Sequence, residues 1–235
     1  MKIEKIVFAG HSAVFFKFGD QQVAIDPWLE GNPVCPENLK NPTELDLIIL
    51  THGHADHAGD VVRLAKACGS SVAATYELAM ILGSQGVPEE KLIPMNKGGS
   101  VGWNGLKVSL TNAFHSSSYD TPNGTLYAGE ACGVVLGDGT RNIYHAGDTC
   151  FFSDIKIIGE FFKPEIAILP IGDRFTMGPA DAALAARALN CKRVIPVHYK
   201  TFPMLTGTAE EFKAELSSFD IEVVVLEPGE SLDLG

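Results

Sequence analysis

The chain has 235 residues, of which 46% are hydrophobic and 20% are charged. These values are ordinary for a globular protein with a substantial core. Acidic residues outnumber basic residues by 29 to 18, and the resulting net charge of −11 argues against broad nucleic-acid binding, because phosphates would repel the chain.

The first residues and the cysteines indicate the cellular compartment of the protein. The opening MKIEKIVFAGHSAVFFKFG contains Glu4 and no long apolar run, so we expect no signal peptide, and no later stretch resembles a membrane span. The five cysteines are scattered and never form a C-x-x-C pair, which favours reduced thiols. We therefore expect a cytoplasmic protein without membrane contact.

The first third of the chain is predicted to be rich in strands. Short apolar or alternating runs over 3–10, 13–20 and 21–27 are broken by Gly-His-Ser, Gly-Asp and Asp-Pro. Residues 28–44, WLEGNPVCPENLKNPTE, have no periodicity and are predicted to form an ordered surface loop. The length of this loop suggests a lid or a substrate loop.

Strands and helices then alternate, return to strands, and alternate again. The predicted elements are a strand at 45–50, a helix at 58–69, a strand at 70–75, a helix at 76–84, a strand from 107 that ends in a loop at His115, a hairpin at 132–149, a buried strand at 165–172, a helix at 178–190, a strand at 193–201, a helix at 208–219 with a Thr-x-x-Glu capping pattern, and a closing strand at 221–230. This order indicates two similar halves, each a sheet with helices on its outer face. We see no repeat and no linker, so we expect one domain over 1–235.

A dense histidine cluster, THGHADHAG, follows the strand at 45–50. His52 and His54 are two residues apart, so in an extended segment both side chains point the same way and can face one metal ion. Asp56 and His57 come next, at the turn into a helix, where they point differently and can hold a second ion. Each ion then needs a further ligand from elsewhere.

Three distant residues occupy similar positions. His115, Asp148 and His198 each follow an apolar strand-like run, and ligands gather at the carboxyl ends of strands. His115 and His198 are candidates for the missing ligands, and Asp148 can bridge two cations because a carboxylate has two oxygens. Imidazole and carboxylate together suit Zn, Mn, Fe or Ni.

The cluster resembles the H-x-H-x-D-H signature of the metallo-β-lactamase superfamily. AGDT at 146–149 resembles that superfamily's bridging-aspartate motif, and PVHY at 196–199 resembles its last histidine. GHSA, DPWLEGNP, YHAGDT and LPIGDRFTMGP are similar to a family of single-domain metal-dependent hydrolases, related to ascorbate-6-phosphate lactonase-like and phospholipase D-like N-acylethanolamine enzymes.

The resemblance implies an α/β fold, a four-layer αββα sandwich with a dinuclear site on one edge. It also implies the ligand sets: His52, His54 and His115 for one metal ion, Asp56, His57 and His198 for the other, and Asp148 as the bridge. This assignment agrees with the grouping by residue type and spacing.

We therefore expect a dinuclear metallohydrolase. Two divalent ions about 3.5–4 Å apart share a water, lower its pKa, and direct the hydroxide at a carbonyl or phosphoryl centre of a small molecule. Asp56 is expected to orient the nucleophile or relay a proton. A phosphodiester and a lactone or other ester both fit. The alternatives are a di-iron oxidoreductase and a non-catalytic metal-binding protein, and we also expect a homo-oligomer.

Three further residues are candidates for substrate contacts or for supporting the ligands. His11, in a turn, either bonds to backbone or contacts substrate or a ligand. Asp26, at a strand end, either caps a turn or orients a ligating histidine. Arg174 either forms an ion pair with Asp173 or another carboxylate, or binds an anionic substrate group. For His145, on a strand, we expect a packed or hydrogen-bonded side chain.

Overall fold

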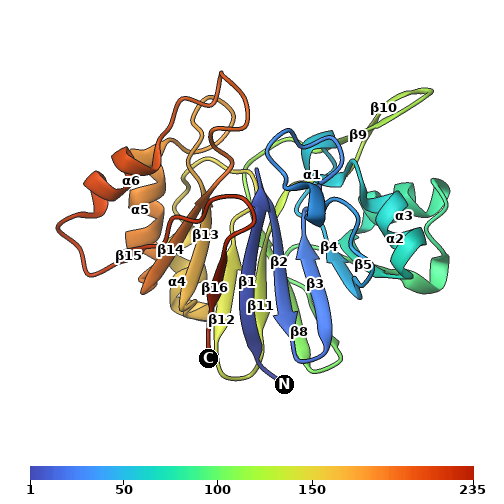
Figure 1. The fold of residues 1–235 in the computed structure, drawn as a ribbon, viewed down its shortest axis with the longest axis horizontal. Helices are drawn as coiled ribbons and strands as arrows, with labels where there is room; N and C mark the ends of the chain where they lie inside the picture. The colour runs from blue at the N-terminus through green and yellow to red at the C-terminus, as the bar shows by residue number, and fades with distance from the viewer. The chain divides into compact units, whose positions relative to one another are not determined.

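The chain forms two units, each built around a seven-stranded sheet, in the computed structural model of residues 1–235 (Figure 1). Unit 1 comprises residues 1–96, 116–131 and 227–235. Unit 2 comprises residues 97–115 and 132–226. The division matches the two similar halves that the order of elements predicts, except that both units also take segments from the other half of the sequence.

The sheet of unit 1 has the strand order β16-β1-β2-β3-β4-β5-β6. Its strands are β1 (Ile3–Gly10), β2 (Ala13–Phe18), β3 (Gln21–Ile25), β4 (Leu47–Ile49), β5 (Ser71–Thr75), β6 (Leu92–Met95) and β16 (Ser231–Asp233). Strands β16 to β3 pair antiparallel, and β3 to β6 pair parallel. A parallel pair needs a crossover connection, which explains why helices appear only after β4.

The helices of unit 1 cover one face of this sheet (Figure 1). They are α1 (Ala55–Ala58), α2 (Val61–Cys68) and α3 (Tyr76–Ser84), with short 3-10 turns η1 (Glu37–Leu39) and η2 (Glu89–Lys91) in the connections. Ile48 and Val72 of the sheet share a hydrophobic cluster with Leu64 and Leu78 of the helices. The predicted helix at 58–69 is confirmed as α2, which begins three residues later and ends where Gly69 adopts a left-handed conformation, and α1 was not predicted.

Unit 2 repeats the same plan. Its sheet has the order β15-β14-β13-β12-β11-β8-β7, antiparallel from β7 to β12 and parallel from β12 to β15. The strands are β7 (Ser100–Trp103), β8 (Leu106–Asn112), β11 (Cys132–Gly137), β12 (Asn142–His145), β13 (Ile166–Pro170), β14 (Arg193–Val197) and β15 (Glu222–Val223). The turn between β11 and β12 contains the Gly-Asp-Gly that predicts a hairpin there.

Three helices pack on one face of the second sheet: α4 (Ile155–Phe162), α5 (Pro179–Leu189) and α6 (Ala209–Leu216). Helix α6 begins with the predicted capping box, in which Thr208 and Glu211 bond to each other's backbone N–H. Helix α4 was not predicted. Each unit therefore supplies one sheet layer and one helix layer, which together are the four layers of the expected fold class.

Two further elements differ from the predictions. The closing strand expected at 221–230 is strand only over Glu222–Val223, and from residue 227 the chain belongs to unit 1, where Ser231–Asp233 pairs with β1. A small hairpin of β9 (Ser118–Thr121) and β10 (Gly124–Tyr127) belongs to unit 1 and was not predicted.

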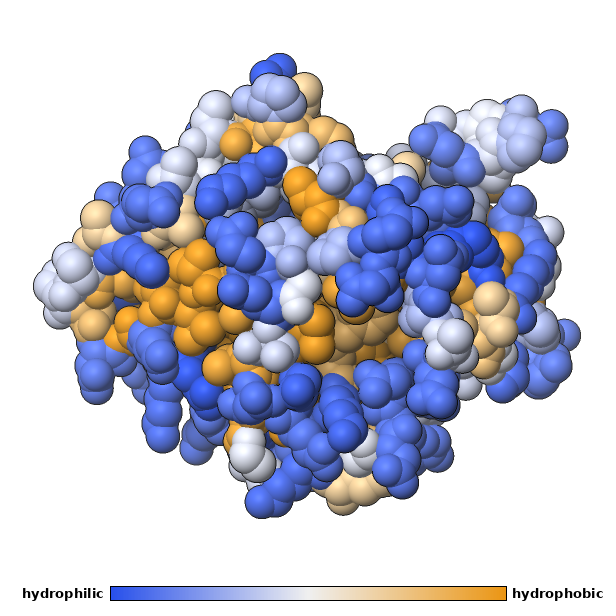
Figure 2. All heavy atoms as spheres, in the orientation of Figure 1, coloured by the Kyte–Doolittle hydropathy of each residue, from blue (hydrophilic) through white to orange (hydrophobic).

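The surface is mainly polar. On the face shown in Figure 2, hydrophilic residues predominate, and hydrophobic residues gather over the strands and helices of unit 2. No helix has both the length and the apolar character that crossing a membrane requires.

Candidate metal centre

The histidine cluster begins directly beyond β4 in unit 1. His54 has an extended conformation and is the N-cap of α1, so His52 and His54 precede the helix while Asp56 and His57 lie on it. This change of backbone conformation separates the side chains into the two pairs that the spacing predicts.

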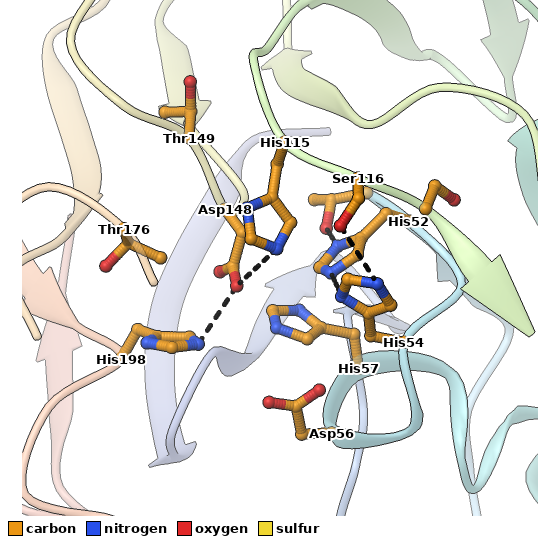
Figure 3. A network of polar contacts seen from close by, with 12 residues as sticks. His52, His54, Asp56, His57, His115, Ser116, Asp148, Thr149, Thr176 and His198 are labelled. Atoms are coloured by element: carbon orange, nitrogen blue, oxygen red, sulfur yellow. Dashed lines mark hydrogen bonds and ion pairs between the residues drawn. The ribbon is translucent and has the colours of Figure 1, made fainter. Parts of the chain in front are cut away.

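His52 and His54 face one another. Nε2 of His52 lies 3.0 Å from Nδ1 of His54 (Figure 3), and His52 is completely buried. Two nitrogens bound to one tetrahedral zinc ion at about 2.1 Å lie about 3.4 Å apart. The separation of the two ring nitrogens is therefore close to that of two ligands of a single ion.

Asp26 determines which nitrogen of the neighbouring histidines carries the proton. A carboxylate only accepts hydrogen bonds, so His57 donates its Nδ1–H to Asp26 across 2.8 Å. The Thr51 hydroxyl donates its one proton to Asp26 across 2.6 Å and so accepts the Nδ1–H of His52 across 3.0 Å. Both rings then keep the lone pair on Nε2, as a metal ligand must.

Both carboxylate oxygens of Asp26 accept hydrogen bonds. Its Oδ1 also accepts the backbone N–H of Thr51 at 2.8 Å, and the side chain is completely buried. Asp26, His52 and His57 offer ligand atoms within 4.8 Å of one another. However, a carboxylate with three hydrogen-bond donors on it fits the role of an acceptor that orients ligands better than the role of a ligand.

His11 supports Asp56 in a similar way. Its Nε2 lies 3.0 Å from Oδ2 of Asp56, and its ring makes an edge contact with Trp28 at a centroid distance of 5.4 Å. His11 is buried and has a left-handed backbone (φ 58°), which a residue without β-branching tolerates in a tight turn. Of the two readings of the sequence, the structure favours a contact to a candidate ligand.

Gly53 allows the cluster to pack against the β9–β10 hairpin. A Cβ atom at this position would lie 2.7 Å from the carbonyl oxygen of Ser118 and 2.8 Å from the Cβ of Ala128. The backbone N–H of Gly53 also donates to Ser117 Oγ at 3.2 Å. Sequence reasoning missed these contacts, although the Asn-Gly pair at 123–124 is a hairpin signal that would have located the hairpin.

The other candidate ligands converge within unit 2. His115 follows β8, Asp148 follows β12 and His198 follows β14. Oδ2 of Asp148 lies 3.0 Å from Nε2 of His198 and 3.6 Å from Nε2 of His115 (Figure 3). One carboxylate oxygen therefore receives an imidazole from each side, as expected for residues at the carboxyl ends of β8, β12 and β14, which alternate with β11 and β13 in the sheet.

Thr149 fixes the loops that carry these residues. Its hydroxyl accepts the backbone N–H of Phe114 at 3.0 Å, and its carbonyl accepts the N–H of Met177 at 3.0 Å. The residue after Asp148 thereby joins the loop of His115 to the loop that follows β13. Nothing in the sequence signals this role.

Two other predictions concern side chains near the ends of the strands. His145 is buried, and its Nδ1 accepts the N–H of Gly147 at 3.1 Å, so it is hydrogen-bonded as expected.

Arg174 does not form the ion pair with Asp173 that was one alternative. Oδ1 of Asp173 instead accepts the backbone N–H of Arg174 at 2.7 Å, because both residues have left-handed backbone that turns the main chain toward the carboxylate.

The loop at 28–44 is fastened to α2. Asp60 Oδ2 accepts the backbone N–H groups of Leu29 and Glu30 at 2.6 and 2.8 Å. Arg63 bonds to Asp60 and to the carbonyl of Lys40, at the other end of the loop. These contacts tie both ends of the loop to the first turn of α2.

Comparisons with known proteins identify the family. A family model described as the beta-lactamase superfamily domain matches residues 21–199. The chain belongs to the metallo-β-lactamase superfamily. A UPF0173 metal-dependent hydrolase of Rubrobacter xylanophilus is 44% identical over 233 residues, which cover 97% of this chain and 96% of that protein. The expected enzyme class, a metal-dependent hydrolase of this superfamily, is confirmed.

Solved structures confirm the expected α/β fold of the metallo-β-lactamase type. Igni18, a metallo hydrolase from the archaeon Ignicoccus hospitalis, has a TM-score of 0.88 and 34% identity, over 100% of this chain and 99% of that one. CmlA, a diiron β-hydroxylase from Streptomyces venezuelae, has a TM-score of 0.75 and 15% identity, over 100% of this chain and 55% of that one. At 15% identity, the similarity to CmlA supports the fold alone.

Proposed function

We propose that this metallo-β-lactamase superfamily member is a single-domain dinuclear hydrolase over 1–235 that binds two divalent metal ions. The proposed donor set is His52, His54, Asp56, His57, His115, Asp148 and His198. The observation that carries the proposal is the hydrogen-bond network of Asp26 and Thr51, which leaves the lone pair of both His52 and His57 on Nε2.

The chemistry of the donor sets fits such ions. Imidazole nitrogens and carboxylate oxygens suit Zn, Mn, Fe or Ni, and ligating histidines usually donate their other N–H to a carboxylate or a similar acceptor. His57 does so to Asp26, and His52 does so to Thr51. Any buried histidine needs an acceptor for its ring N–H, so the informative feature is that both rings donate through Nδ1 and leave the lone pair on Nε2.

The expected division of ligands remains our proposal. His52, His54 and His115 would hold one ion, and Asp56, His57 and His198 would hold the other. Asp148 would serve both, which fits a carboxylate oxygen already approached by His115 and His198.

The residues of the chain would then act as follows. When bound, the ions supply Lewis acidity that polarises a substrate oxygen and lowers the pKa of a coordinated water. Asp56, held by His11 through Oδ2, orients the attacking water or takes up its proton. His11 and Asp26 position ligands and do not touch the reacting atoms. The substrate is a phosphodiester, or a lactone or other ester, since a water activated in this way attacks either centre.

Metal content and turnover test the proposal together. We expect zinc- or manganese-loaded protein to hold about two ions per chain and to hydrolyse a chromogenic phosphodiester or a chromogenic ester. His54→Ala in unit 1 and His115→Ala in unit 2 should each lower both the metal content and the rate.

The matched control is His145→Asn, which removes a histidine outside both sets and retains an acceptor for the N–H of Gly147. Metal content that His54→Ala or His115→Ala leaves at the wild-type level would contradict the ligand role of that histidine. A metal-loaded Asp56→Asn variant with unchanged turnover would remove the proton-handling role of Asp56.

A further inference from the structure

The segment between β13 and α5 is a rigidly built loop. Within IGDRFTMG (171–178), the N–H of Asp173 donates to the carbonyl of Met177 at 3.0 Å, and the N–H of Phe175 donates to the carbonyl of Asp173 at 2.5 Å. The N–H of Met177 is bound to Thr149, the neighbour of Asp148. The loop is therefore tied both to itself and to a segment that carries a candidate ligand.

The backbone at the tip of this loop is strained. Asp173 and Arg174 have φ values of 64° and 54°, in the left-handed region that residues other than glycine rarely occupy. Two such residues in succession persist only where the surroundings enforce them, and strain of this kind concentrates at functional sites. The strained tip thus holds the Arg174 backbone in one defined conformation.

The loop lies against the segment that carries His198. A Cβ atom on Gly172 would lie 2.0 Å from the carbonyl oxygen of His198, so only glycine permits this approach. In Figure 3, Thr176 of the same loop lies beside Asp148 and His198. Arg174 therefore belongs to the rim around the carboxyl ends of the parallel strands in unit 2.

The guanidinium of Arg174 has no carboxylate partner. Arg63 pairs with Asp60 and Arg193 pairs with Glu165, whereas Arg187, over the ring of Phe219, resembles Arg174 but lies on α5 and not on this loop. Arg174 is exposed and lies over the ring of Phe175 at 5.5 Å, and half of Phe175 is exposed as well. In a chain with a net charge of −11, a cation without a partner on this rim favours an anion that arrives from solvent.

We propose that Arg174 binds a carboxylate or phosphate group of the substrate that is separate from the bond being cleaved. The proposal rests on the proposed function and narrows its substrate class to esters that carry an additional anionic group. A guanidinium presents paired N–H donors to either kind of anion, and Phe175 beneath it limits the directions that the side chain can take.

The test compares two 4-nitrophenyl esters of equal chain length, the mono-ester of glutarate and the neutral pentanoate. Metal-loaded protein should prefer the glutarate ester, and Arg174→Gln should lower the ratio of the two kcat/KM values about tenfold, the size expected for a charge-assisted hydrogen bond at an exposed site. Arg174→Lys should recover part of the ratio. Arg187→Gln removes an exposed charge in the last turn of α5 and should leave the ratio at its wild-type value.

Binding without turnover separates this proposal from the function it rests on. Glutarate and glycerol 3-phosphate should each raise the Tm of metal-loaded wild-type protein, and the one with the larger effect identifies the preferred anion. Arg174→Gln should reduce that shift and Arg187→Gln should not. If neither ester is hydrolysed, the proposed ester hydrolysis is wrong, and the Tm shifts with glutarate and glycerol 3-phosphate still decide whether Arg174 binds an anion. The proposal would be overturned if wild-type protein and Arg174→Gln had the same ratio of kcat/KM values for the two esters. It would also be overturned if Arg174→Gln and Arg187→Gln showed the same Tm shifts.

Discussion

Replacing Asp26 with asparagine should disrupt the metal centre without removing a ligand. The amide has nearly the shape of the carboxylate but carries two N–H donors in place of one oxygen. All three contacts of Asp26 come from donors: the N–H and the hydroxyl of Thr51, and Nδ1–H of His57. Whichever way the amide turns, at least one donor then meets another donor.

The two orientations have different consequences. If the amide nitrogen faces the Thr51 N–H, a buried donor loses its acceptor, which costs about 1–3 kcal/mol of folding free energy. If it faces His57, the proton of that ring must move to Nε2. The Thr51 hydroxyl then turns toward Nδ1 of His52, so the proton of that ring moves to Nε2 as well. Both rings would present N–H where a lone pair is needed.

We therefore expect Asp26→Asn to lower metal affinity about 10–100-fold, the usual effect of removing a partner of a ligating histidine. Competition with a chromophoric chelator measures the affinity, and nitrogen chemical shifts of the imidazoles report the position of each proton. Thr51→Val is the matched control, because it should affect His52 while His57 keeps its bond to Asp26. An Asp26→Asn variant with wild-type affinity, lone pairs still on Nε2 and wild-type stability in urea would refute this reasoning.

Three further substitutions or conditions have defined outcomes. Gly53→Ala should lower stability in urea by about 1–3 kcal/mol, because the new Cβ overlaps the Ser118 carbonyl; Gly102→Ala, which meets no atom within 4 Å, should be near neutral. Asp60→Ala should make the loop at 28–44 sensitive to limited proteolysis while the hydrophobic core stays intact, and unchanged cleavage would show that the loop is held by other contacts. Burial raises the pKa of the Cys191 thiol to about 12, so above pH 9 the unfolded chain releases this proton first and stability should fall as pH rises; Cys191→Ala should flatten that slope.

The ligands were predictable because they follow a rule that is local in sequence. A run of buried residues followed at once by a polar one indicates a strand end, and this signal placed His52, Asp148 and His198 correctly within their own units. The helices with a strong start or stop signal were also found, including α6 with its capping box.

The parts that failed depend on contacts between distant segments. Helix α4 is an exception, because Ser153-Asp154 before the apolar run is a start signal that the prediction missed, although Asp154 makes no side-chain cap in the structure. The need for glycine at position 53 arises only because the β9–β10 hairpin packs there. The role of Asp26 was left open between a turn cap and a partner of histidine, and only the positions of Thr51 and His57 decide it.

The pairing of β16 with β1 has a consequence for synthesis on the ribosome. Lys5, Ile6 and Val7 pair with Asp233, Leu232 and Ser231, so one edge of the first sheet stays open until more than two hundred later residues have been made. An open strand edge is a template for pairing with another chain. Contacts this far apart in sequence also form late. The nascent protein therefore carries its histidine cluster long before its sheet is closed, and chaperones that shield strand edges should matter most during this interval.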